Sequence, residues 1–382
     1  MNMKMKSNPY VYPSTNFMDL SKKQIKAVFK PNRLASTENL KDLLSSLSYP
    51  ELILSGNSIA EKILNIFVDD EIIFGPKKFV IDNTDFWLES FQYFINQNKP
   101  IQLTILGFPF KMPVPIKTNR SLPDMGEVLS LKRLHFLTEL IRKVYKPGAK
   151  ITIVTEGVFG RYNKMDKSEY DSYKDLLIEI IKKFNWDNSL FIVELESMEQ
   201  LINNFNDVFG EKVNKLKNLY LNADKNFLKK YKGAKLSISR IINTRDLGVS
   251  NSVLMDVYNI KLRNKIATAE VVKIRKYIKA MTHETLLNYH AYLMVRDDLN
   301  FIEKTVPNAI TLSVSPKPNR LGIIPVNKNC IRLPYHGVPV FHVKKNIFTI
   351  EYLIDVLRMK ETFIRVYWKE DKENKPFYYI KK

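Results

Sequence analysis

The fold is decided by residues 104–137, which read TILGFPFKMPVPIKTNRSLPDMGEVLSLKRLHFL. A strand-like run, Gln102 to Leu106, is followed by a loop that contains Gly and several Pro residues. Asp124 then predicts the start of a long helix, which we expect from about Pro123 to Val144. Ligands of α/β proteins bind beyond the carboxyl ends of the strands, so this strand–loop–helix connection is a candidate functional site.

The same pattern repeats downstream. Ala149 to Thr155, AKITIVT, is dense in β-branched residues and predicts a second strand. Tyr170 to Phe184 has helical periodicity, and Ser189 to Leu195 predicts a third strand. Strands that alternate with helices indicate parallel βαβ units. We therefore predict an α/β fold with a Rossmann-like three-layer parallel sheet. The chain has no G-x-G-x-x-G motif, so a nucleotide cofactor is not indicated.

We predict three regions along the chain. Residues 1–35 contain several prolines and are expected to form an N-terminal arm. Residues 36–345 form the main domain, which includes a largely helical insertion at about 196–305. Residues 346–382 form a small C-terminal extension. It consists of a helix, Thr349 to Met359, and a hairpin in which FIRVYWKE and PFYYIKK flank a KENK turn.

The chain is strongly basic, with a formal net charge of +20 from 60 Lys and Arg against 40 Asp and Glu. Only 14 of the 60 basic residues are arginine, and the abundant lysines accompany Asn and Ile, the residues that AT-rich codons encode. The lysines are spread along the chain and are not gathered into one block. This favours a generic surface charge, and leaves affinity for nucleic acid or an anionic membrane as the alternative.

Cys330 is the single cysteine, so neither an internal disulfide nor a cysteine-based metal cluster can form. The longest apolar runs are too short to cross a bilayer, and the basic N-terminus lacks the apolar core of a secretory signal. We expect a cytoplasmic protein without a membrane partner.

Asp124 and Glu127 have the D-x-x-E spacing of a capping box, which would account for both acids by helix initiation alone. Glu127, Leu131 and His135 also fall within an arc of about 80° on one helix face. A carboxylate and an imidazole on one pocket wall suit acid/base chemistry near neutral pH. Both interpretations remain open from the sequence.

Basic and acidic residues mark the other predicted loops. Lys111 and Lys117 flank a proline-stiffened loop beside a helix N-terminus, where a phosphate would meet ammonium and N–H groups together. Glu156 follows the second strand, and Arg161 could bind a phosphate or carboxylate as a fork. His336 lies in a loop between two prolines. For each of these side chains an ordinary solvated surface residue is the alternative.

Three separated motifs then indicate a family. The motifs are GFPFK with LPDMGE and R-L-H in the first segment, KPGAKITIVTEGVFGRY at 146–162, and PNAITLSVSPKPNRLGI with LPYHGVP within 307–339. In this order, over roughly Leu103 to Pro339, the chain resembles the isonitrile (isocyanide) synthases, also called pyoverdine/dityrosine biosynthesis proteins.

The resemblance implies a function in secondary metabolism. Such an enzyme converts the amino group of an aromatic L-amino acid, tyrosine or tryptophan, into an isonitrile. Its carbon donor is ribulose 5-phosphate as a co-substrate, and no metal or redox cofactor is implied. The expected partners are therefore small-molecule substrates, with an iron/2-oxoglutarate oxygenase acting downstream in the same pathway.

The resemblance and the loop chemistry together give each residue an expected role. Lys111 and Arg161 would hold the phosphate, and Glu127 with His135 would transfer protons. Glu156 would receive the amino group, and His336 would be a second acid/base group. The expected substrate-binding residues are Lys111, Lys117, Asp124, Arg161, Tyr162, Arg296 and Lys317.

The chain departs from the family pattern at three places. Glu156 stands where the family usually has Asp, and Ser315 stands where it has His. Arg296 corresponds to a family arginine, but the aromatic residue that follows it is missing. Two other functions remain open: a basic nucleic-acid-binding protein, and another α/β transferase, for which GFPFKMP is a poor Gly-rich loop.

Overall fold

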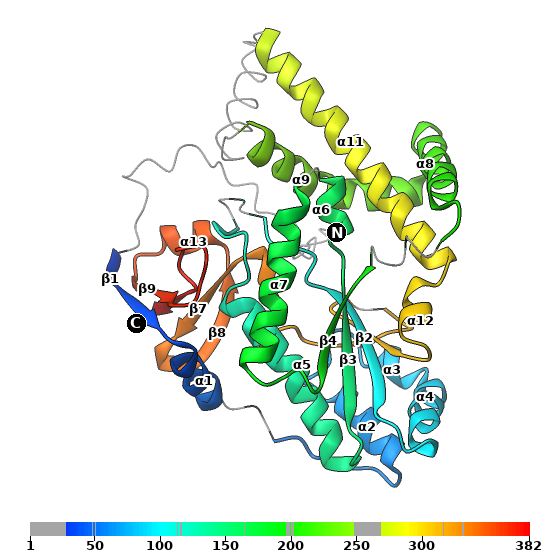
Figure 1. The fold of residues 1–382 in the computed structure, drawn as a ribbon, viewed down its shortest axis with the longest axis vertical. Helices are drawn as coiled ribbons and strands as arrows, with labels where there is room; N and C mark the ends of the chain where they lie inside the picture. The colour runs from blue at the N-terminus through cyan, green and yellow to red at the C-terminus, as the bar shows by residue number, and fades with distance from the viewer. Residues whose placement is uncertain are drawn as a thin grey trace, which may run out of the picture.

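The structure, a computed structural model, describes residues 28–382 apart from 48, 50, 113, 115–116, 164, 196–198, 200–201, 248–268, 316 and 331. Most of the predicted N-terminal arm, residues 1–27, lies outside the described residues. The described residues form two five-stranded sheets, and helix α5 (Met125–Val144) lies between them (Figure 1).

The first sheet is parallel throughout and has the strand order β4-β3-β2-β5-β6. Its central strands pair along their whole length, from Ile101 opposite Ala149 to Gly107 opposite Thr155. This sheet contains the three strands predicted from the sequence and confirms the α/β fold class. The strands are β2 (Ile101–Gly107), β3 (Ala149–Thr155), β4 (Leu190–Glu194), β5 (Ile310–Ser313) and β6 (Leu321–Gly322).

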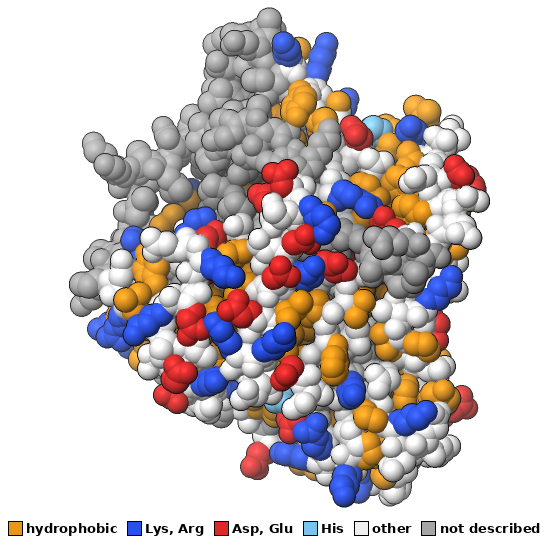
Figure 2. Space-filling model, in the orientation of Figure 1, with side chains coloured by type: hydrophobic (Ala, Val, Ile, Leu, Met, Phe, Trp, Pro, Cys, Tyr) orange, Lys and Arg blue, Asp and Glu red, His pale blue; other side chains and the backbone are white. Residues whose placement is uncertain are grey.

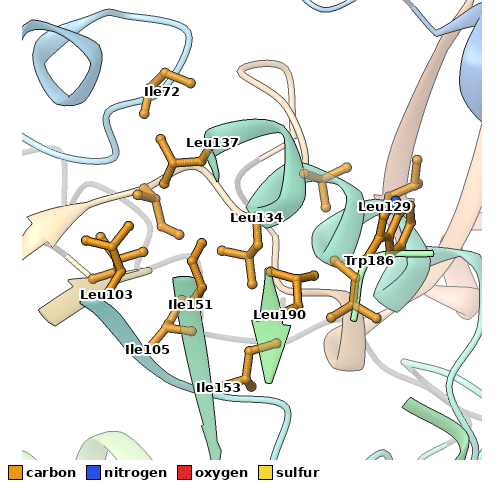
Figure 3. Packing of buried hydrophobic residues seen from close by; sticks show 14 of the residues in the cluster. Ile72, Leu103, Ile105, Leu129, Leu134, Leu137, Ile151, Ile153, Trp186 and Leu190 are labelled. Carbon is orange, nitrogen blue, oxygen red and sulfur yellow. The ribbon is translucent and has the colours of Figure 1, made fainter. Parts of the chain in front are cut away.

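Alternate residues of β2 and β3 face opposite layers, as the pleat of a strand requires. On one face, Leu103, Ile105, Ile151 and Ile153 pack in the same buried cluster as Leu134 of α5 (Figure 3). Other helices of this cluster are α1 (Thr37–Ser46), α2 (Ile59–Val68), α4 (Thr84–Asn96) and α7 (Lys167–Lys183), and the short α3 spans Lys78–Ile81.

The opposite face of the sheet carries a second buried cluster. Leu106 and Val154 pack there with Tyr292 and Val295 of α11 (Ala269–Asp298) and with Phe301 of α12 (Phe301–Thr305). The short helix α6 (Val158–Tyr162) contributes to the same cluster. Helices thus cover both faces of the sheet, which gives the three layers predicted from the sequence.

Helix α5 begins and ends where its sequence signals lie. Asp124 is the N-cap of a complete capping box with Glu127. The helix ends at Val144, and Gly148 in the following turn has a φ of +70°, a conformation that suits glycine. The expected range, Pro123 to Val144, is therefore correct to within two residues.

A second sheet holds the C-terminal region, in the order β1-β9-β10-β7-β8. The predicted hairpin is present as the antiparallel pair of β9 and β10, at the centre of this sheet. Parallel pairs flank it, β1 with β9 and β10 with β7, and β8 pairs antiparallel with β7. The strands are β1 (Val28–Ala35), β7 (Val338–His342), β8 (Ile347–Glu351), β9 (Thr362–Trp368) and β10 (Tyr378–Lys381).

Two expectations for the chain ends need correction. Residues 28–35 were expected in a loose arm and form β1, because a strand near the other end of the chain supplies its hydrogen bonds. The predicted helix Thr349 to Met359 is shorter, since Ile347–Glu351 pairs as β8 and only α13 (Leu353–Arg358) is helical. The predicted domain limit at residue 345 falls between the paired strands β7 and β8. The domain limits remain a prediction.

The segment predicted to be largely helical contains α8 (Phe205–Leu221), α9 (Lys225–Leu247), and the whole of α11 and α12. Helices α8, α9 and α11 pack together at one end of the molecule (Figure 1), where Leu216, Ile238 and Leu287 share a buried cluster. The last turn of α11 brings Arg296 down to the first sheet, in contact with Glu156 just beyond β3. No helix among the described residues is long and apolar enough to cross a membrane.

Many lysines on the face shown in Figure 2 have acidic neighbours, and blue and red side chains are interspersed there. Along α7, Lys167 pairs with Asp171, and Lys174 pairs with both Asp171 and Glu194. Pairs of this kind near the surface are worth little energy. They show, however, that the basic residues of this helix do not form an uncompensated stripe.

Arg120 connects the long loop after β2 to the β9–β10 turn. Its guanidinium donates two hydrogen bonds to Asp371, at 2.8 and 2.7 Å, and one to the Lys375 carbonyl at 2.8 Å. Both side chains of this ion pair are buried. A buried pair is costly to break, because the partner that remains is an unpaired charge.

We predict that Arg120→Met lowers the free energy of unfolding by about 3–5 kcal/mol, because Asp371 would be left buried and unpaired. Urea denaturation followed by circular dichroism would measure it. Arg142→Met is the matched control, since its pair with Glu139 is exposed and should cost less than about 1 kcal/mol. Equal losses in the two variants would contradict the role of Arg120.

Candidate functional site

The carboxyl ends of β2, β3 and β5 open onto one edge of the first sheet. The loop after β2, Glu156 after β3, the 314–320 segment after β5 and the 3-10 helix η2 (Pro334–His336) all lie at this edge. Most of the predicted site residues are found here, in three adjoining groups.

The first group is a buried ion cluster at the start of α5. The Lys111 Nζ lies 2.6 Å from Asp124 Oδ2 and 3.0 Å from Glu127 Oε2, and all three side chains are 0% exposed. The Tyr173 hydroxyl donates to the other Glu127 oxygen at 3.2 Å. Two carboxyl groups thus share one cation without access to water. Burial raises the pKa of Asp124 to about 8, and the nearby Glu127 adds to this rise against the opposing effects of Lys111 and Arg120.

The same two acids also form the capping box. Asp124 accepts from the backbone N–H of Gly126, and Glu127 Oε2 accepts from the backbone N–H of Asp124, both at 2.8 Å. The capping interpretation is therefore confirmed. It is compatible with a role of the same acids in acid/base chemistry. The acids begin the helix and at the same time hold Lys111.

Lys111 was expected to bind a phosphate, and in the structure its side chain is turned to two acids. Its ammonium group is enclosed and already contacts two carboxylates. An incoming phosphate would have to separate Lys111 from the two buried carboxyl groups that it contacts. Lys111 instead serves as the counter-ion of Asp124 and Glu127.

The second group joins Lys117 and His336. The Lys117 ammonium lies 3.2 Å from His336 Nδ1, so the imidazole accepts this hydrogen bond and carries its proton on Nε2. Burial lowers the pKa of His336 well below its ordinary value, and Lys117, Arg332 and Lys111 lower it further. His336 is therefore neutral at physiological pH.

The third group surrounds Glu156. The Arg296 Nη1 lies 3.3 Å from Glu156 Oε1. Burial raises the pKa of Glu156, while Arg296, Arg320 and Lys317 oppose the shift. Arg296 is buried, Arg320 is partly buried and Lys317 is exposed, so the positive charge extends from the interior to the surface. Burial lowers the pKa of Lys317, and so do Arg320 and Arg296. Arg296 is also bound to Asp297 at 2.7 Å, so Lys317 and Arg320 are the cations of this group that could bind an anion.

His135 does not join Glu127, contrary to the expectation. Its Nδ1 lies 3.0 Å from the hydroxyl of Ser189, a residue that precedes β4, and its ring stacks on Trp186. Ser189 marks the amino end of that strand, whereas Glu127 lies at the carboxyl edge of the sheet. Two turns of helix also separate His135 from Glu127 by about 12 Å. Glu127 and His135 do share one helix face, but this face extends across the sheet, so the two side chains lie at opposite edges.

Arg161 and Tyr162 also lie elsewhere than expected. Arg161 donates to both carboxylate oxygens of Glu199, at 3.0 and 2.7 Å, so its fork is already occupied. Tyr162 stacks on Phe209 with 5.7 Å between ring centroids, within the packing between α6 and α8. Neither residue belongs to the three groups.

Several residues of the site were not predicted. Arg320 could have been found, because it lies three residues after Lys317 in the same loop. The sequence gives no signal for three tyrosines, because tyrosine is frequent in this chain and their placement depends on packing. These are Tyr173, Tyr289 and Tyr335. Tyr335 adjoins His336 of the second group, and the centroids of their rings lie 4.6 Å apart.

Two further observations concern possible ligands. Ser315, where the family has His, is held by a hydrogen bond from its backbone N–H to the Ser313 hydroxyl at 3.1 Å.

Among the described residues, no group of three or more His, Cys, Asp or Glu side chains could hold a metal ion.

Comparisons with known proteins agree with the fold and the motifs. The profile of the family described as pyoverdine/dityrosine biosynthesis protein matches residues 91–354. The L-tryptophan isonitrile synthase AmbI2 of Fischerella ambigua is 27% identical over 270 residues, which cover 68% of this chain and 73% of that protein. The L-tyrosine isonitrile synthase of Pseudomonas aeruginosa is 40% identical over 91 residues, 24% of this chain and 28% of that protein.

A solved structure shows the same fold. The crystal structure of the PvcA protein from Pseudomonas aeruginosa matches with a TM-score of 0.61 at 20% identity, over 83% of this chain and 99% of that chain.

We predict that the buried acid Asp124 makes stability depend on pH. Its pKa is raised from about 4 to about 8 on folding, so the folded state binds a proton that the unfolded state has lost. The free energy of unfolding should therefore fall as pH rises from about 4 to about 8. Asp124→Asn keeps the N-cap acceptor and should reduce this fall, measured by urea denaturation at several pH values.

Asp82→Asn is the control for this prediction, because Asp82 is exposed. It should have the same pH dependence as the unmodified protein. An Asp124→Asn variant with an unchanged slope would show that Asp124 is ionised in the folded state.

Proposed function

The chain belongs to the pyoverdine/dityrosine biosynthesis protein family, as its motifs indicated, and from this we propose that it is an isonitrile synthase. The substrate we propose is tyrosine or tryptophan, whose amino group becomes the isonitrile. Ribulose 5-phosphate is the proposed carbon donor. Relatives named L-tryptophan isonitrile synthase and L-tyrosine isonitrile synthase support the reaction type.

The observation that carries the proposal is the group around Glu156. A sugar phosphate needs cations near the surface for its phosphate and an acid/base group further inside for its carbonyl end. Lys317 and Arg320 supply cations from the exposed side, while Arg296 holds Glu156 at the inner side. These cations take the phosphate-binding role that the sequence had suggested for Lys111 and Arg161.

The other two groups supply proton transfer. The proposed reaction begins when the amine condenses with the ketone to form an imine, and proton transfers and carbon–carbon cleavages follow. Glu127 can exchange protons with Lys111 and Asp124, since all three lie within hydrogen-bonding or ion-pair distance. Glu156, with a pKa raised by burial, is suited to accept a proton from the amine. Neutral His336 can donate from Nε2.

We predict that the purified protein, incubated with tyrosine or tryptophan and ribulose 5-phosphate, forms the isonitrile of one of these amino acids. Mass spectrometry after trapping with a tetrazine would detect it. Omission of ribulose 5-phosphate is the control. If neither amino acid gives a product, the proposed function is wrong.

In the same assay, the variant Glu127→Gln distinguishes a role of Glu127 in proton transfer from its role in helix capping. Gln is accepted at this position of a capping box, so the helix should still begin at Met125. Loss of a proton-transfer group should reduce kcat roughly 100-fold or more. An active, folded variant would leave Glu127 with the capping role alone.

We also predict that Arg320→Ala raises the KM for ribulose 5-phosphate by roughly 10- to 100-fold, because one charge-assisted hydrogen bond to the phosphate is lost. The KM for the amino acid should change little. Arg161→Ala is the matched control, since Arg161 is bound to Glu199. An increase in the Arg161 variant with none in the Arg320 variant would place the phosphate at α6 instead.

A further inference from the structure

A cavity of about 260 Å³, open to solvent, lies between α1, α5 and the turn after α7. His135 lines it and contacts Ser189 at the amino end of β4, so the cavity lies at the sheet edge opposite to the proposed reaction site. Within the described part of the chain, no residue of the three groups lines it. Small-molecule pockets measure roughly 300–1,000 Å³, so this cavity suits a small ligand with one ring system.

Aromatic side chains form most of the apolar wall of this cavity. Phe136 comes from α5 and stacks on Tyr49, with 4.0 Å between the ring centroids. Phe184 and Trp186 come from the turn after α7, and their rings stack at 5.0 Å. Trp186 also lies beside α5 (Figure 3). Such walls favour a flat ring, because ring–ring contacts add to the gain from burying apolar area.

His135 offers a hydrogen-bond acceptor at this cavity. The Ser189 hydroxyl donates its proton to the Trp186 carbonyl at 3.2 Å. His135 Nδ1, which lies 3.0 Å from the same hydroxyl oxygen, is therefore the donor of that contact and carries a proton. Burial lowers the pKa of His135, which favours the neutral ring. Nε2 is then an acceptor, and no donor among the described residues binds it.

Lys132 and Lys41 supply positive charge to the lining. The Lys132 ammonium donates to the Leu44 carbonyl near the end of α1, and its two other protons remain for a ligand. Burial lowers the pKa of Lys132 to about 8, so the group is still mostly protonated at pH 7. Glu139 is the one acid among the described lining residues, and it is paired with Arg142 at 2.9 Å. The cavity thus favours an anionic ligand.

We propose that this cavity binds a small aromatic carboxylate whose ring carries an N–H or O–H group, as in indole and phenol carboxylic acids. The ring lies among the aromatic walls, its N–H or O–H donates to His135 Nε2, and its carboxylate contacts Lys132. The inference does not depend on the proposed function, because it uses no residue of the three groups. It also gives a role to His135, which has none at the reaction site.

Three probes separate the contributions of the donor and the carboxylate. Calorimetry would compare indole-3-acetate with 1-methylindole-3-acetate, which lacks the N–H group, and with indole, which lacks the carboxylate. The unmodified protein should bind indole-3-acetate roughly five- to tenfold more tightly than the methylated probe, and roughly tenfold or more tightly than indole. No binding of indole-3-acetate, or equal affinity for it and for either of the other probes, would overturn the proposal.

Variants of two lining residues assign the contacts. His135→Phe should bind indole-3-acetate and its methylated form equally, and Lys132→Met should lose most of the preference over indole. Lys143→Met removes an exposed lysine of the same helix and should keep both preferences. Unchanged preferences in folded His135→Phe and Lys132→Met would refute the site. If neither variant folds, the comparison of the three probes in the unmodified protein still decides.

A variant of the reaction site tests the location of the probe. Arg320→Ala should bind indole-3-acetate with unchanged affinity, because Arg320 does not line the cavity. A marked loss of affinity in this variant would place the probe at the reaction site and overturn the proposal. None of these measurements requires isonitrile formation, so the cavity and the proposed function can fail separately.

Discussion

The buried contact of Lys111 with Asp124 and Glu127 is the constraint on which the rest of the site depends. It joins the loop after β2 to the first turn of α5, and α5 lies between the two sheets. A buried ion cluster is a poor source of stability, because desolvation offsets much of the attraction. Its value lies in geometry: it keeps two carboxyl groups in a dry environment, where one of them can hold a proton at neutral pH.

The burial of Lys111 also limits which cations at the sheet edge could bind an anion. Since Lys111 is paired inside the protein, we propose other cations for the phosphate, and Lys317 and Arg320 are the ones nearest the surface. The proposed site thus has the carboxyl groups of Asp124 and Glu127 on the α5 side, and Lys317 and Arg320 beyond β5.

The fold was largely predictable, because the strands β2 to β4 and helix α5 have strong local patterns. The second sheet was not, since its parallel pairs join segments far apart in the chain, as Val28 does with Thr362. For the site, Asp124, Glu127, Glu156, Arg296 and Lys317 were placed at the correct edge. His135 was misplaced because helical periodicity identifies a face and gives no position along the sheet that the face crosses.

The sequence by itself determined the α/β class, the beginning and end of α5, and the family, because capping signals, strand patterns and ordered motifs are local. Only the tertiary structure decided what each charge contacts. Lys111 and Arg161 are equally basic in the sequence, yet one is enclosed by two carboxylates and the other is paired with Glu199. Burial and the choice of partner arise from segments distant in the chain, and these determine which cations remain available to a ligand.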